Sequence, residues 1–524
     1  MEDSLKVDRS AFSRNASWPW FFASTFVFSL LIQIYDPLIK HKLQFPISPW
    51  ELDGRIVFVN SFEKNIYWGR PVQGLLQMIL PSQQNWYLMN MISLASTPVI
   101  CMLAISIAIS PKTHPYYFML VSVVSMLILR STSGFVSSWA YMSVITNGLA
   151  TFLGLLALLI LLKLVKSNSK IFLYSLCFVA CTLLSVLSKQ DAIFGLALAG
   201  LVVFTTQISQ MTTSFWRKNP HFCLTLFPMM VLAAEYLRNK YSQTFFSSNT
   251  GTYARVLNPV SILDSFFKYP GAGTSRFIFC LALASLIALT IKKIFFNNVD
   301  KMNDVKSRLN DRLRTSSAVI AFGLGLRFPY LILPYHQFDW YSNYWLLVDF
   351  AALSLLAKTL FSFFKPAIRA YLIVFCSACF FWSSYLPGNR EILPNDRIRV
   401  EGWFVQRVQE NENIVKFLKE NSSIILKSDC MKVLNTNFET PWIFDTGAYL
   451  QRLLGKKIKW SAEVSDETYA FIRQFPEFEY MSSLSDQQDI AIYSSGMSPV
   501  MPDCGVIRFD GELSGRGRIL KTRD

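Results

Sequence analysis

Stretches of about 20 apolar residues, repeated along the chain, constrain the fold more than any other feature of this sequence. A helix needs a run of about this length to cross the hydrocarbon core of a bilayer, where the segment itself must satisfy its backbone polar groups. The 524 residues contain such stretches at residues 18–35, 86–110, 115–130, 139–163, 170–188, 191–209, 221–237, 275–297, 315–333, 343–363 and 367–386. The sequence therefore predicts a polytopic α-helical membrane protein with about eleven spans.

Composition agrees with a membrane protein and argues against a soluble one. Only 16% of the residues are charged, where ordinary globular chains carry about 25%. The first stretch is followed by Asp36-Pro37-Leu38 and not by a small-residue cleavage site, so we expect an uncleaved first helix and no signal peptide. The weakest predicted spans are 115–130, which is short, and 221–237, which Pro228 interrupts.

The lysine and arginine distribution predicts the orientation of the chain. With the N-terminus in the cytoplasm, the cytoplasmic connections carry more Lys and Arg than the longer outer ones, as the positive-inside rule requires. The formal net charge of +15 is thereby explained by topology, and we expect no nucleic-acid partner. The basic segment Lys301–Arg314 is expected to be a cytoplasmic loop near anionic headgroups.

The last 138 or so residues, 387–524, have a soluble composition and alternate helix-like with strand-like patterns. We expect a transmembrane catalytic domain over residues 1–386 and an extracytoplasmic α/β domain over 387–524. Cys430 and Cys504 both lie in the second part, where an oxidising compartment favours a disulfide over two unpaired thiols. The other cysteines lie in apolar spans and are expected to behave as small hydrophobic residues.

The outer connection 36–85 carries the most informative polar residues. Asp36, Glu51 and Asp53 place carboxylates at the membrane surface, where one of them can take a proton from an acceptor hydroxyl as a general base. Alternatively, Glu51 and Asp53 hold a divalent cation such as Mg²⁺ or Mn²⁺ against a phosphate. Trp68 can stack on a sugar or anchor the connection at the interface.

Cations near the predicted outer ends of the spans form a second group of candidates. Lys189 lies between two spans, and Arg327 lies within one, where an arginine is costly unless it is functional or paired. Arg327 is either a ligand for a donor phosphate or the partner of Asp349. We expect Trp345, like Trp340, to be an anchor in the aromatic belt of the membrane interface.

The outer connection contains a motif similar to one in the bacterial O-antigen glucosyltransferases of the GT-C superfamily. The motif is Asp53-Gly54-Arg55, followed by Tyr67-Trp68-Gly69-Arg70-Pro71. The predicted topology is also similar to that of the family. The segment Ser188-Lys189-Gln190-Asp191 resembles a Ser-Lys-Glu element of some members. The chain differs in having Glu51-Leu52-Asp53 where the family has adjacent aspartates.

The resemblance implies an inverting glycosyltransferase in a bacterial inner membrane, with its site on the periplasmic side and a role in cell-envelope polysaccharide biosynthesis. Its partners would be a polyprenyl-phosphate sugar donor, a glycan or lipid-linked acceptor, and the bilayer. The expected substrate-binding residues are Arg55, Arg70, Lys189, Arg327, His336 and Trp68, with Arg327, Lys189 and His336 at the donor phosphate.

Two other classes remain open on the sequence. A polysaccharide polymerase or ligase would share the outer site but use a lipid-diphosphate donor. A lipid-linked sugar transporter or flippase would need ionisable residues along a path through the spans. The intramembrane charges Glu235, Arg327 and Asp349 gather near the outer half, which favours a site over a path.

Overall fold

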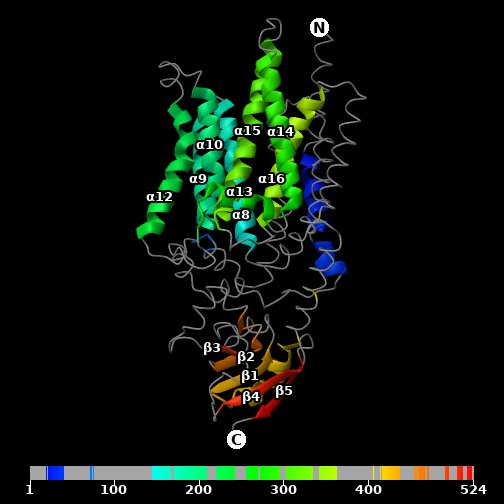
Figure 1. The fold of residues 1–524 in the computed structure, drawn as a ribbon. Helices are drawn as coiled ribbons and strands as arrows, with labels where there is room; N and C mark the ends of the chain where they lie inside the picture. The colour runs from blue at the N-terminus through cyan, green and yellow to red at the C-terminus, as the bar shows by residue number, and fades with distance from the viewer. Residues whose placement is uncertain are drawn as a thin grey trace.

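The computed structural model describes a helical bundle and, toward the C-terminus, a small β-sheet (Figure 1). The described residues are 19–40, 71–72, 75, 144–166, 170–208, 220–241, 255–269, 272–295, 303–333, 341–362, 405, 413–436, 454–466, 469–470, 490–494, 504–510 and 516–521, with gaps at 21, 33, 167–169, 415 and 457. Figure 1 places the sheet beyond one end of the bundle, the end toward which α9 and α15 run.

The helices follow the predicted spans closely where both are described. After a first helix over Phe22–Ile32 and the π-helical turn η1 (Tyr35–Lys40), the bundle comprises α8 (Val144–Lys166), α9 (Ile171–Ser188), α10 (Asp191–Ile208), η2 (Pro220–Leu226), α12 (Phe227–Tyr241), α13 (Pro259–Lys268), α14 (Gly273–Phe295), α15 (Asn303–Leu331) and α16 (Tyr341–Ser362).

Three of the described helices, α8, α9 and α14, are long and apolar enough to cross a membrane. The predicted spans 86–110, 115–130 and 367–386 lie outside the described residues, so the number of spans stays a prediction.

Two elements differ from the sequence expectation. The segment 221–237 begins as the 3-10 helix η2 and becomes α-helical at Phe227, next to the predicted interruption at Pro228. The basic segment expected as a loop is helical from Asn303, because α15 continues through it for 29 residues, or about 44 Å. A helix of that length exceeds the hydrocarbon core, so its basic N-terminal part extends beyond the span.

Helices α10 and α15 run in opposite directions and touch through glycines (Figure 1). A Cβ atom on Gly325 would lie 2.4 Å from the carbonyl oxygen of Phe194 and 2.6 Å from the Cα of Gly195. A Cβ on Gly195 would lie 2.8 Å from the carbonyl oxygen of Phe322. Small residues let membrane helices approach backbone to backbone, and this contact fixes the depth of α10 against α15.

We predict that Gly325→Ala forces α10 and α15 apart and destabilises the protein by about 1–3 kcal/mol, the usual cost of overpacking. The measurement is the thermal unfolding midpoint in detergent, which should fall. Leu324→Val, at the neighbouring position with a side chain 40% exposed, is the matched control and should leave the midpoint unchanged. Equal midpoints for the two variants would contradict the glycine contact.

The C-terminal sheet has the strand order β3-β2-β1-β4-β5. Its strands are β1 (Cys430–Thr436), β2 (Lys459–Val464), β3 (Ile490–Ser494), β4 (Gly505–Asp510) and β5 (Arg516–Lys521). β1 pairs in parallel with β2 and β4, and β2 with β3; among the described strands only β5, at one edge, is antiparallel to its neighbour. A short helix, α19 (Ser422–Ile425), precedes β1. These strands lie within the predicted α/β domain 387–524, whose boundaries stay a prediction.

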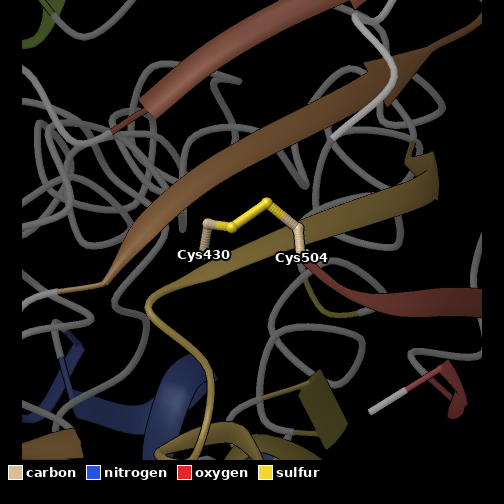
Figure 2. Close-up of a disulfide and its surroundings, with 2 residues drawn as sticks. All are labelled: Cys430 and Cys504. Atoms are coloured by element: carbon tan, nitrogen blue, oxygen red, sulfur yellow. A yellow bond between two sulfur atoms is a disulfide. The ribbon is translucent and has the colours of Figure 1, made fainter. Parts of the chain in front are cut away.

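A disulfide joins Cys430 to Cys504, as the sequence led us to expect (Figure 2). It links the first residue of β1 to the residue before β4, two strands that lie side by side, and the two Cα atoms are 4.8 Å apart. The bond closes a loop across a sequence separation of 74 residues. Disulfides persist in oxidising compartments, and the extracytoplasmic location of residues 387–524 stays a prediction.

Removing the disulfide should destabilise the sheet by about 4 kcal/mol, because the bond restricts the unfolded chain over a long loop. We expect Cys430→Ala with Cys504→Ala to lower the unfolding midpoint and to abolish the mobility shift that reductant causes on a denaturing gel. Cys223→Ala, which removes an exposed free thiol, is the control. Alkylation of both Cys430 and Cys504 without reductant would contradict the bond.

Candidate functional site

The junction of α9 and α10 places two charged side chains, Lys189 and Asp191, at one end of the bundle. α9 ends at Ser188, and Lys189 leaves the helix in an extended conformation, its amide donating to the carbonyl oxygen of Ser185 at 3.0 Å. α10 begins two residues later with Asp191. The cation at a helix C-terminus and the carboxylate at a helix N-terminus both complement the helix dipoles. A two-residue turn therefore holds Lys189 and Asp191 together.

Lys189 lies among a carboxylate and two phenol rings, and we call Lys189, Asp191, Tyr330 and Tyr341 the Lys189 cluster. The Nζ atom is 3.2 Å from Oδ2 of Asp191 and donates to the hydroxyl of Tyr341 at 3.4 Å. It also stands 4.5 Å and 5.8 Å from the ring centroids of Tyr341 and Tyr330, within the range of a cation–π interaction. The side chain of Lys189 is 13% exposed, so the ammonium group is largely desolvated.

The two tyrosines come from α15 and α16 and complete the cluster. Their rings stack with centroids 4.0 Å apart, and the hydroxyl of Tyr330 donates to Oδ2 of Asp191. Tyr330 lies one turn beyond Gly325, and Asp191 one turn before Gly195. The glycine contact of α10 with α15 thus brings the phenol of Tyr330 to the carboxylate of Asp191.

A second ion pair lies beside the junction. Glu235 of α12 accepts hydrogen bonds at Oε2 from Nε2 of Gln190 at 3.1 Å and from Nη2 of Arg238 at 2.7 Å. The sequence marked Glu235 as an intramembrane charge, and its neighbours neutralise it. This pair borders the Lys189 cluster and ties α12 to the junction.

Arg327 is buried and pairs with Asp349, one of the two roles that the sequence left open. Its guanidinium group donates to the carboxylate of Asp349, to the hydroxyl of Ser275 at 2.7 Å and to the carbonyl oxygen of Gly323 at 2.9 Å. The side chains of Arg327 and Asp349 are each 2% exposed. Ser275 also donates to Asp349 at 2.8 Å. The pair links α14, α15 and α16, and it accounts for the charge of Arg327 without a ligand.

Trp345 lies between the Arg327 pair and the Lys189 cluster. Its ring is 5.3 Å from the guanidinium carbon of Arg327, 5.8 Å from the ring of Tyr330 and 4.7 Å from that of Tyr269. Trp345 is 3% exposed, so the expectation that it anchors the interface belt is wrong. It fails because a buried tryptophan beside polar groups and a belt tryptophan look alike in sequence.

The remaining candidates lie outside the described residues. These are Glu51, Asp53, Arg55, Trp68, Arg70 and His336, and with them the predicted cation site of Glu51 and Asp53. Asp36 falls in the turn η1, but its side chain is not described. Their roles as base, cation ligands and substrate contacts stay predictions.

Tyr330 and Tyr341 are cluster members that the sequence analysis did not select. Tyr330 is three residues from Arg327 and follows Pro329, and Tyr341 begins α16. The signal that could have found them is their position at the same predicted outer boundary as Lys189. Aromatic residues there are so common as interface anchors that the signal is weak.

Comparisons with known proteins leave the family open. No protein-family model matches the chain, and no curated protein matches it. Among solved structures, the chain is similar to the crystal structure of ArnT from Cupriavidus metallidurans bound to undecaprenyl phosphate. The identity is 11%, the match covers 94% of this chain and 93% of that chain, and the TM-score is 0.36. The function therefore has to be argued from the residues of this chain.

If Arg327 has a structural role, its pairing with Asp349 should be needed for stability. Asp349→Leu alone should destabilise the protein by about 3–5 kcal/mol, because it leaves a buried guanidinium group unpaired. Arg327→Met combined with Asp349→Leu should recover most of this loss, since both charges are then removed. Thermal unfolding of the single and double variants in detergent checks this. A double variant no more stable than the single one would contradict the pairing.

Proposed function

We propose that the protein is a membrane glycosyltransferase of the GT-C type. It moves a sugar from a polyprenyl-phosphate donor to a hydroxyl group of a glycan or lipid-linked acceptor, with inversion at the anomeric carbon. The single observation that carries the proposal is the Lys189 cluster, a desolvated cation at the end of an apolar helical bundle. A donor of this kind has an apolar tail that suits the surroundings of the spans and an anionic headgroup that suits Lys189.

The geometry supports different roles for Arg327, which is buried, and Lys189, which is partly exposed. Arg327 donates to Asp349, Ser275 and Gly323, so its hydrogen-bonding capacity is largely used inside the protein. Lys189 lies at the end of the bundle, where its side chain is 13% exposed, against 2% for that of Arg327. We therefore assign the phosphate to Lys189 and give Arg327 the role of supporting the site through Trp345.

In the proposed reaction, a carboxylate of the outer connection removes the proton of the acceptor hydroxyl. The hydroxyl oxygen forms a bond to the anomeric carbon from the face opposite the phosphate. The bond from that carbon to the phosphate oxygen breaks, and the polyprenyl phosphate leaves with the electron pair. A single displacement with one general base inverts the configuration.

Lys189 would stabilise the charge that develops on the leaving phosphate, because a fixed cation in a desolvated site costs no reorganisation at the moment of reaction. Asp191 and Tyr341 hold its ammonium group in place.

The other proposed roles belong to residues of the outer connections. The candidates for the base are Asp53, Asp36 and Glu51, and the candidates for a Mg²⁺ or Mn²⁺ site are Glu51 and Asp53. Arg55, Arg70, Trp68 and His336 complete the proposed substrate contacts. The proposed location is the outer face of a bacterial inner membrane.

The test is sugar transfer by the purified protein in lipid, with a panel of polyprenyl-phosphate sugars. We expect Lys189→Met to lower the turnover rate about 100-fold or more, the usual effect of losing a preorganised charge contact. Lys268→Met, which removes an exposed lysine of α13, is the matched control and should keep full activity. Unfolding midpoints measured beside the rates show that both variants fold.

Asp36→Asn, Glu51→Gln and Asp53→Asn, measured in the same assay, identify the base as the one whose loss abolishes transfer while donor binding remains. Full activity of Lys189→Met would contradict the role of the cluster. Consumption of lipid-diphosphate donors alone would favour a polymerase or ligase. Movement of a lipid-linked sugar across the bilayer without transfer would favour a flippase.

A further inference from the structure

The helix α13 presents three different faces around its axis. It has 10 residues, or about 15 Å, which is too short to span a bilayer. Val260, Leu263 and Phe267 follow the spacing of one helical face, and they are 74%, 57% and 59% exposed. Large apolar side chains exposed together on one face are unusual in contact with water.

Of the other two faces of α13, one packs against the protein and the other carries exposed charged side chains. Ile262 and Phe266 pack against the hydrophobic core, and the ring of Phe266 lies 5.9 Å from that of Phe279 in α14. Asp264 and Lys268 form an exposed ion pair at 2.9 Å on the third face. A helix with protein on one side, an apolar side and a charged side fits the boundary between hydrocarbon and headgroups.

The apolar face of α13 continues the outward apolar stripe of the span α14. Leu283, Ile287 and Ile291 lie four residues apart in α14 and are 38%, 51% and 48% exposed, as a lipid-facing stripe is. Arg276 lies on the same face, about two turns closer to the start of α14, and donates to the carbonyl oxygens of Phe266 and Phe267. The C-terminal end of α13 is thus fastened to the end of the lipid-facing stripe.

The start of α13 is fastened as firmly. Asn258 caps it by accepting a hydrogen bond from the amide of Val260 at 3.0 Å, with Pro259 at the first helical position. Just before the cap, the amide of Val256 donates to the carbonyl oxygen of Ile332 at 2.8 Å, two residues beyond Tyr330. α13 therefore lies at the Lys189 end of the spans, where the hydrocarbon gives way to headgroups.

We propose that α13 is embedded in the surface of the membrane leaflet at the Lys189 end of the bundle. Val260, Leu263 and Phe267 lie among the upper acyl chains, and Asp264 and Lys268 lie among the headgroups. The occupant of this apolar face is lipid, because the face is continuous with the lipid-facing stripe of α14. Through Val256 and Ile332 the membrane surface holds the end of α15 that carries Tyr330. This inference does not depend on the proposed sugar transfer.

The test is photo-crosslinking of the full chain in phosphatidylglycerol–phosphatidylethanolamine nanodiscs. A benzophenone-bearing amino acid replaces Leu263 in one protein and Asp264 in its matched control, one residue further on the charged face. Illumination and mass spectrometry then identify what the benzophenone has reacted with. We expect acyl-chain adducts at position 263, in a yield several times higher than at position 264.

Two results would overturn the proposal. One is a covalent dimer or an intrachain crosslink as the main product at position 263, which would mean that a second copy or another part of this chain covers the face. The other is equal lipid yields at positions 263 and 264, which would mean that α13 has no oriented contact with the leaflet. Phe267, labelled in a third protein, keeps the test valid if the protein labelled at 263 does not fold.

Discussion

The backbone contact between Gly195 and Gly325 is the constraint on which the rest of the helical structure depends. It brings the backbones of α10 and α15 together at Gly325, and Asp191 and Tyr330, four and five residues away along the two helices, then meet. Lys189 takes its position from Asp191 and from the stacked tyrosines. A shift of about one helical residue, 1.5 Å, between the two helices would separate these partners.

The two cations of the bundle, Arg327 and Lys189, have different surroundings, and the difference shows which of them is accessible to a ligand. Arg327 lies in the interior, where a carboxylate, a hydroxyl and a backbone carbonyl take up its hydrogen bonds. Lys189 lies at the end of the helices, where its ammonium group contacts two tyrosine rings and its side chain is partly exposed. Trp345 separates the two, so the interior charge supports the outer one through packing.

Apolar run length predicted the described spans from sequence, because a span must satisfy its backbone within one long apolar segment. The same rule missed α13, whose apolar residues Val260, Leu263 and Phe267 alternate with polar ones over only 10 residues. The sequence identified Lys189 as a cation between two spans and Arg327 as a costly charge within one, but it could not decide between a ligand and Asp349 as the partner of Arg327. That choice depends on how deep α15 and α16 sit against each other, which is a property of tertiary packing and not of either helix alone.

The pairing of Arg327 with Asp349 also bears on how the chain enters the membrane. The arginine is synthesised 22 residues before its partner, so α15 emerges from the ribosome with an uncompensated charge. An arginine at the centre of a helix costs about 2.5–3.5 kcal/mol to insert. Insertion of α15 and α16 together, as a helical hairpin, neutralises that charge within one step. The position of one carboxylate, 22 residues after the arginine, thus makes joint insertion of the two helices less costly than insertion of α15 alone.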